Sequence, residues 1–321
     1  MVNNILEIQK LSVIYPTLNG PIKAVDSVNL AVREGEVLGL VGESGSGKST
    51  LGLAILKLVP PPGKIVSGSV IYDGVDILSL SDELLQRIRG KEISMVFQDP
   101  SSSLNPLMRI KDHFIELFKN HEPTISKKEI EERSIKILER LGIPSERFDS
   151  YPHELSGGMR QRVYIGLAIA LNPKVLIADE PTTALDVLIE AQILKLLNKL
   201  KHEMNLTMIL ITHNMGLVAE NADRVAVMYA GKIIEVGSKE EVFSKPLHPY
   251  TEGLIRSAPN FMKRYRSISS IPGEPPDLAS LPQGCVFNPR CPYRFEKCFK
   301  VHPPLIEVGD RVVACYLYGD V

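Results

Sequence analysis

Gly42-Glu43-Ser44-Gly45-Ser46-Gly47-Lys48-Ser49 is the most informative segment of this chain of 321 residues. It fits the pattern G-x-x-x-x-G-K-[ST] and stands between an apolar run, Val37–Val41, and the helically spaced apolar residues of Leu51–Leu58. A strand, a glycine-rich loop and a helix in this order predict a phosphate-binding loop, because backbone N–H groups and the helix N-terminus face the anion. The residues expected at a bound nucleotide are Gly42, Ser44, Gly45, Ser46, Gly47, Lys48, Ser49 and Thr50.

Two more apolar runs end in polar residues, as buried parallel strands do. Val175–Ala178 leads into Asp179-Glu180, and Met208–Ile211 leads into Thr212-His213. With Lys48 reaching the β- and γ-phosphates, we expect Ser49 and Asp179 to hold Mg²⁺ and Glu180 to polarise the attacking water. By itself the acidic pair would as often be a solvated strand end; the phosphate loop favours the catalytic interpretation.

Composition limits the classes of protein that need to be considered. Hydrophobic residues make up 44% and charged residues 23%, which is ordinary for a folded chain, and the net charge of -1 gives no global attraction to nucleic acid. The longest apolar stretches, such as Leu51–Val59 and Val163–Leu171, are too short to cross a bilayer. The first residues lack the pattern of a secretory signal, so we expect a cytosolic chain. The balanced charge leads us to expect that the chain does not bind nucleic acid.

The sequence pattern changes twice along the chain. From about 99 to 165 it is charged and helix-favouring, notably Ser126–Leu141, where Ile130, Ile137, Leu138 and Leu141 are spaced for one apolar face. From 246 to 321 it is rich in proline and has little periodicity. We therefore predict an α/β core over 1–245 with an inserted helical subdomain, followed by a small, irregular C-terminal extension.

Leu155-Ser156-Gly157-Gly158-Met159 identifies the class within the many users of phosphate loops. On its own this turn, which precedes the helical run Arg162–Leu171, would be read as a helix cap. Placed just ahead of Asp179-Glu180, however, it resembles the signature Leu-Ser-Gly-Gly-Gln of the ABC ATPase family, with Met159 in place of glutamine. This resemblance implies a P-loop ABC ATPase fold, a parallel sheet with an antiparallel N-terminal part.

The resemblance also implies roles for single residues. Gln98 matches the glutamine that senses Mg²⁺ and the γ-phosphate and signals to the membrane partner. Asp186, in Ala184-Leu185-Asp186, matches the D-loop, and His213 matches the histidine that contacts the γ-phosphate. Tyr15 is the candidate for stacking on adenine. In this family two subunits pair head to tail, so each ATP would lie between the Lys48 loop of one subunit and the Ser156 turn of the other.

All four cysteines, Cys285, Cys291, Cys298 and Cys315, lie within 31 residues of the extension. In a reducing compartment such a cluster indicates metal thiolates before disulfides, and its spacing does not choose between zinc and iron–sulfur. The extension resembles that of the ATPase subunits of oligopeptide and dipeptide importers, some of which carry a [4Fe-4S] cluster. That resemblance favours [4Fe-4S] over Zn²⁺ and over unligated thiols.

The resemblance implies an ATPase at the cytoplasmic face of the membrane that drives peptide uptake. Its expected partners are a second ATPase subunit, often a related but different chain, two transmembrane permease subunits and an extracytoplasmic peptide-binding protein. An importer of nickel or sugars stays open, and a soluble ABC ATPase that does not transport is the alternative from another class. A small-molecule kinase is disfavoured by Ser156-Gly157-Gly158 and His213.

Overall fold

Val37–Val41 forms the strand β3, and all five of its residues are buried. The computed structural model describes every residue except 1–2, 19, 99–103, 184, 258–269 and 320–321. The chain divides into a first unit, 1–79 with 210–321, and a second unit, 80–209. The phosphate loop and the cysteine-containing extension thus belong to the same unit.

The described residues of the first unit form strands of two sheets and four short α-helices. Its elements in chain order are β1 (Asn4–Thr17), β2 (Gly20–Arg33), β3 (Val37–Val41), α1 (Lys48–Ile55), β4 (Lys64–Tyr72), β5 (Val75–Asp76), α8 (Met215–Asn221), β9 (Arg224–Tyr229), β10 (Lys232–Ser238), α9 (Lys239–Ser244), α10 (Pro249–Ser257), β11 (Ile306–Val308) and β12 (Arg311–Val313). Short 3-10 turns add Ile77–Ser79 and Glu296–Phe299. The strand β8 (Thr207–Thr212) begins in the second unit and ends in the first.

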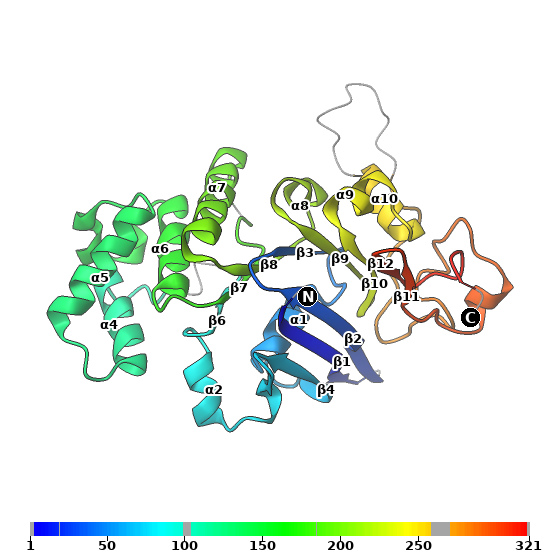
Figure 1. Cartoon of the computed structure of the whole chain (residues 1–321), viewed down its shortest axis with the longest axis horizontal. Coiled ribbons are helices and arrows are strands. Elements are labelled where there is room, and N and C mark those ends of the chain that lie inside the picture. Colours follow the sequence, from blue (N-terminus) through cyan, green and yellow to red (C-terminus); the bar gives the residue numbers. More distant parts are fainter. Residues whose placement is uncertain (1–2, 19, 99–103, 184, 258–269, 320–321) are drawn as a thin grey trace. The chain divides into compact units, whose positions relative to one another are not determined.

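The strand pairing confirms the predicted mixture of parallel and antiparallel strands. An antiparallel sheet has the order β2-β1-β4-β5, drawn in blue and cyan in Figure 1. In the other sheet β3 pairs with β9 in parallel, β9 pairs with β10 antiparallel, and β12 and β11 follow β10. The C-terminal extension, which the sequence predicts to be irregular, adds the short hairpin β11–β12 to this sheet, with Val313 opposite Glu235.

The second unit is mostly helical. Its elements are α2 (Asp82–Ile88), β6 (Ile93–Val96), α4 (Ile110–His121), α5 (Lys127–Arg140), α6 (Gly157–Ile169), β7 (Val175–Asp179) and α7 (Val187–Met204), with 3-10 turns at Ser145–Asp149 and Pro152–Glu154. Strands β6 and β7 pair in parallel, and α4, α5 and α6 pack on one another (Figure 1). Phe114, Phe118, Ile130 and Leu138 are fully buried and form the core of this helical part.

The helices largely follow the predicted pattern, with two differences. In α5, Ile130, Leu138 and the following Leu141 are buried as expected, whereas Ile137 stays partly exposed. The helix α6 begins at Gly157, five residues before the expected Arg162, because Ser156 caps it. No helix within the described ranges is both long and apolar enough to cross a membrane.

Candidate nucleotide site and thiol cluster

The phosphate loop depends on two of its glycines. Gly47, which precedes α1, has φ +104°, and a Cβ atom on it would lie 2.1 Å from the carbonyl oxygen of Ala24. A Cβ atom on Gly42 would lie 2.1 Å from the carbonyl oxygen of Met228. Any side chain at either position would push the loop away from the sheet, so the loop needs glycine there.

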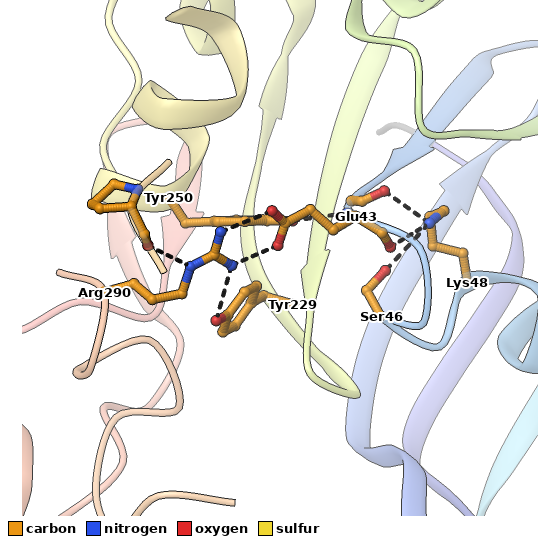
Figure 2. A network of polar contacts seen from close by, with 8 residues as sticks. Glu43, Ser46, Lys48, Tyr229, Tyr250 and Arg290 are labelled. Atoms are coloured by element: carbon orange, nitrogen blue, oxygen red, sulfur yellow. Dashed lines mark hydrogen bonds and ion pairs between the residues drawn. The ribbon is translucent and has the colours of Figure 1, made fainter. Parts of the chain in front are cut away.

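Lys48 lies across this loop and holds it from within. Its ammonium Nζ donates to the carbonyl oxygens of Gly42 (2.8 Å) and Glu43 (2.9 Å) and lies 3.3 Å from Ser46 Oγ. Figure 2 shows these three contacts. The side chain is buried, so a positive charge lies within the loop, against the carbonyl oxygens of Gly42 and Glu43. A phosphate on the loop would take these hydrogen bonds in place of the carbonyls.

The other predicted residues of the first unit lie in four places. Ser44 and Gly45 are exposed at the tip of the loop, and Ser49 and Thr50 are half-buried in the first turn of α1. His213 is exposed directly after β8. Tyr15 lies in β1 opposite Ile22, with its ring so close to Gly63 that a Cβ atom there would lie 2.5 Å from Tyr15 Cε1.

In the second unit, the predicted catalytic carboxylate is held by two hydrogen bonds. Glu180 Oε2 accepts from Gln98 Nε2 (2.9 Å) and from Thr183 Oγ1 (2.8 Å). Asp179, the last residue of β7, is buried just before it. Glu180 has φ +43°, a conformation that non-glycine residues rarely adopt outside functional turns. The structure thus brings together Gln98 and Glu180, two of the residues predicted for the site.

The Ser156 turn packs against the segment that carries Asp186. Ser156 is exposed and caps α6, with its Oγ accepting from the N–H of Met159 at 3.3 Å. A Cβ atom on Gly158 would lie 2.9 Å from Ile189 Cγ2, and the N–H of Ile189 in turn donates to Asp186 Oδ1 at 2.9 Å. Ala184 of the predicted D-loop lies outside the described residues.

All four cysteines line one cavity of the extension, together with His248, Phe287 and Tyr316. Burial, helped by the neighbouring thiols, raises the pKa of the Cys285 thiol to about 12 and that of Cys315 to about 11. Among the described residues no group of three or more histidine, cysteine or acidic side chains is arranged to hold a metal ion. The residue types and the shared cavity fit a thiolate-bound metal, whereas the present thiol positions are not those of a formed site.

Our sequence analysis missed three residues that hold these loops. Thr183 orients Glu180, and the phosphate loop is gripped from outside by Arg290 and Tyr250, both of which bond to Glu43. One signal could have revealed Arg290: a carboxylate within an anion-binding loop requires a cation nearby. Which of the chain's arginines and lysines supplies that cation cannot be read from the sequence.

Solved structures identify the class of protein that this fold and these loops define. The cassette MJ0796, a bacterial ABC transporter cassette solved as a dimer, matches with a TM-score of 0.65 at 31% identity, covering 73% of this chain and 98% of that chain. A post-hydrolysis form of the same cassette with ADP and Pi matches with a TM-score of 0.64 at 30% identity, with the same coverage. The family model described as ABC transporter matches residues 25–183. The fold and loops are therefore those of an ABC-type ATPase.

Similarity in sequence shows which family of ABC-type ATPases this chain belongs to. A model described as the C-terminal region of oligopeptide/dipeptide transporters matches residues 234–298. The oligopeptide transport ATP-binding protein OppD of Bacillus subtilis is 47% identical over 96% of this chain and 87% of its own length. The dipeptide transport ATP-binding protein DppD of Haemophilus influenzae is 46% identical over 97% of this chain and 95% of its own length. This chain belongs to the family of ATP-binding proteins of oligopeptide and dipeptide ABC transporters.

Proposed function

We propose that this chain binds and hydrolyses ATP at the cytoplasmic face of the membrane and so drives peptide import through two transmembrane permease subunits. The observation that carries the proposal is that one chain contains both a phosphate loop with a buried lysine and a carboxylate held in place by hydrogen bonds. Lys48 stands beneath a phosphate loop, and a Gln98–Glu180 hydrogen bond fixes a carboxylate next to Asp179. Two similar proteins are named for oligopeptide and dipeptide transport, which supports the proposal that the transported molecule is a peptide.

Each residue has a distinct task in the hydrolysis. Glu180 accepts the proton of the attacking water, and its two hydrogen bonds hold the carboxylate in one orientation. Lys48 and His213 stabilise the charge that develops on the γ-phosphate, and Tyr15 stacks on the adenine. Ser49, Gln98 and Asp179 offer the hydroxyl, amide and carboxylate oxygens that Mg²⁺ prefers. Bound Mg²⁺ would neutralise part of the charge on the phosphates.

The exposed Ser156 turn serves the nucleotide of a second ATPase subunit. The N-terminus of α6 presents backbone N–H groups and a hydroxyl to solvent, and both favour a γ-phosphate. Asp186, packed behind this turn through Ile189, supports the same interface. Two ATP molecules gripped across the dimer would close it, and loss of the γ-phosphate would let it open. We infer that the partner is a related second chain, and that an extracytoplasmic binding protein delivers the peptide.

We propose that Cys285, Cys291, Cys298 and Cys315 bind a [4Fe-4S] cluster, with Zn²⁺ as the alternative. Their common cavity supports this, and metal binding would have to move the thiols closer together and displace their protons. Anaerobic purification followed by iron, labile-sulfide and zinc analysis tests it. We expect about four irons per chain. Stoichiometric zinc would support the alternative, and a preparation free of iron, sulfide and zinc would refute both.

Reconstitution tests the transport proposal. The chain is co-purified with its membrane subunits, placed in proteoliposomes and supplied with ATP inside the compartment equivalent to the cytosol. Uptake of a labelled tripeptide is compared with uptake of nickel and of a disaccharide, using a complex with Lys48→Ala as the inactive control. ATP-dependent uptake of peptide alone is expected. Uptake of nickel or sugar without peptide would contradict the peptide assignment while leaving the ATPase intact.

A further inference from the structure

The phosphate loop carries a negative charge of its own. Glu43 is the second residue of the loop, directly after Gly42, and its carbonyl oxygen accepts from Lys48 Nζ at 2.9 Å. A loop that binds a triphosphate depends on positive potential from N–H groups, the helix N-terminus and Lys48. A free carboxylate at this position would repel the nucleotide, so its neutralisation affects nucleotide binding.

The cation that neutralises Glu43 comes from the C-terminal extension. Arg290 donates from Nη1 to Glu43 Oε2 at 2.7 Å and from Nη2 to Glu43 Oε1 at 2.9 Å, a bidentate pair. The Arg290 side chain is only 4% exposed and that of Glu43 is 26% exposed. Burial by itself would lower the pKa of Arg290, but the hydrogen bonds to Glu43 outweigh it and raise that pKa above its ordinary value. The charge on Arg290 is therefore permanent.

Arg290 is itself fixed on its other sides. Its Nε donates to the carbonyl oxygen of Pro272 at 3.0 Å, and its Nη1 lies 3.4 Å from Tyr229 Oη. Figure 2 shows the guanidinium held between these partners and Glu43, with Lys48 on the opposite side of Glu43. Because Nε, Nη1 and Nη2 of the planar guanidinium all donate to fixed partners, Arg290 keeps the Glu43 carboxylate in one place.

The backbone of the loop is tied to the same region. The N–H of Glu43 donates to Tyr250 Oη at 2.8 Å, and the rings of Tyr229 and Tyr250 pack at a centroid distance of 4.5 Å. Pro275, Pro276 and Leu278 of the extension line a small cavity together with the loop residues 43–46. The outer wall of the phosphate loop therefore includes Tyr250 and Arg290, which lie 207 and 247 positions after Glu43 in the chain.

We propose that Arg290 is a positioning residue for ATP binding: it draws the Glu43 carboxylate toward the extension and away from the phosphates, so the affinity for ATP depends on the C-terminal extension. The proposal rests on the Lys48 loop being the ATP site. It predicts that the loss of Arg290 weakens nucleotide binding through Glu43, rather than through general loss of stability. Arg290 touches neither the reacting atoms nor, in this arrangement, Lys48.

Titration of the purified full-length chain with a fluorescent N-methylanthraniloyl-ATP tests this. Arg290→Ala is expected to raise the Kd about tenfold. The double variant Glu43→Gln with Arg290→Ala is expected to return to within about threefold of the wild-type Kd, because the repelling charge is gone. Steady-state kinetics should show the same pattern in KM for ATP, with kcat little changed, as expected for lost binding that is equal in ground and transition states.

A second buried ion pair of the same unit provides the matched control. Arg224 Nη1 donates to Glu36 Oε1 at 2.9 Å and to Oε2 at 3.2 Å, and the hydrogen bonds described for this pair do not involve the phosphate loop. Arg224→Ala should lower the melting temperature yet leave the Kd for the fluorescent nucleotide unchanged. Arg290→Lys, which keeps the charge but loses the bidentate geometry, should raise the Kd about threefold.

Several results would overturn the proposal. Wild-type affinity in Arg290→Ala would do so, and so would an equal loss of affinity in the double variant, since Arg290 would then act only as a structural anchor. If Arg290→Ala does not fold, the test falls to Arg290→Lys, and a wild-type affinity for nucleotide in that variant would overturn the proposal. A wild-type chain that binds no nucleotide at all would instead overturn the proposed function, so the two failures are distinguishable.

Discussion

Glu180 combines an unusual backbone conformation with a constrained side chain. Its φ of +43° places the residue in the left-handed region, and Gln98 and Thr183 donate to the same carboxylate oxygen. Backbone strain of this kind costs on the order of 1–3 kcal/mol and persists at functional sites. These two hydrogen bonds hold the Glu180 carboxylate in one orientation, as a base that takes a proton from a single water molecule requires.

Replacement of Glu180 by glutamine tests this role. The amide keeps the size of the side chain but cannot accept the proton, so we expect turnover to fall by about 100-fold or more while the Kd for ATP stays near that of the wild type. Phosphate release and nucleotide titration measure the two quantities. Glu131→Gln, at an exposed glutamate of the same unit, is the control. Wild-type turnover in Glu180→Gln would refute the assignment.

The residues that touch the nucleotide were predictable from the sequence, whereas those that support them were not. Lys48, Glu180 and Ser156 stand in local patterns whose chemistry is legible within a few positions. Arg290 lies 247 positions from Glu43, and no local pattern links the two. Their contact exists only because the fold brings the extension onto the loop.

At the scale of elements, the N-terminus of α6 illustrates how one residue can have two roles. Ser156 caps the helix by accepting from the N–H of Met159, and the cap alone explains why α6 starts at Gly157. The pattern of apolar residues predicts a helix from Arg162, which is too late, because apolar spacing marks the buried face of a helix and does not mark its capping residue. A cap that is also exposed is free to serve a ligand.

Ser156→Ala separates the cap from the ligand role. Loss of the cap should lower the free energy of unfolding by about 1 kcal/mol, and loss of the hydroxyl should lower ATPase activity about tenfold or more. The matched control is Ser126→Ala: Ser126 caps α5 by accepting from the N–H of Glu129 at 3.2 Å. That variant should lose similar stability and keep its activity. An equal fall in activity in both variants would reduce Ser156 to a structural cap.

The extension also contains a buried histidine whose protonation opposes folding. Burial, together with the nearby charge of Lys232, lowers the pKa of His302 from 6.5 to about 4. The unfolded chain therefore takes up this proton at higher pH than the folded chain, and stability falls as the pH drops from about 7 toward 4. Between pH 7 and 5 this group accounts for a loss of roughly 2 kcal/mol.

Urea unfolding at pH 7 and pH 5 measures that loss. His302→Gln should lose less stability on acidification than the wild-type chain does, by roughly 2 kcal/mol. His153→Gln, at an exposed histidine, should behave like the wild type. The same pH dependence in all three proteins would show that His302 does not titrate as proposed.

At the scale of the whole chain, the sequence indicated the α/β class, the phosphate loop and the helical insertion, and the fold and family comparisons confirm that class. The boundaries at 99–165 and 246–321 stay predictions. The structure groups the extension with the phosphate loop in one unit, since β12 pairs with β10 and Arg290 reaches Glu43. Pairing between distant segments has no signature in composition, so the extension looked irregular in the sequence.

The central claim is that two ATP molecules are gripped between two ATPase subunits. The most direct measurement is the specific rate of phosphate release over a wide dilution series, with the oligomeric state followed by light scattering, for the wild type and for Ser156→Glu. The account predicts that the rate falls as dimers dissociate and is lost in Ser156→Glu. An undiminished rate from monomers at every dilution, unaffected by Ser156→Glu, would contradict it.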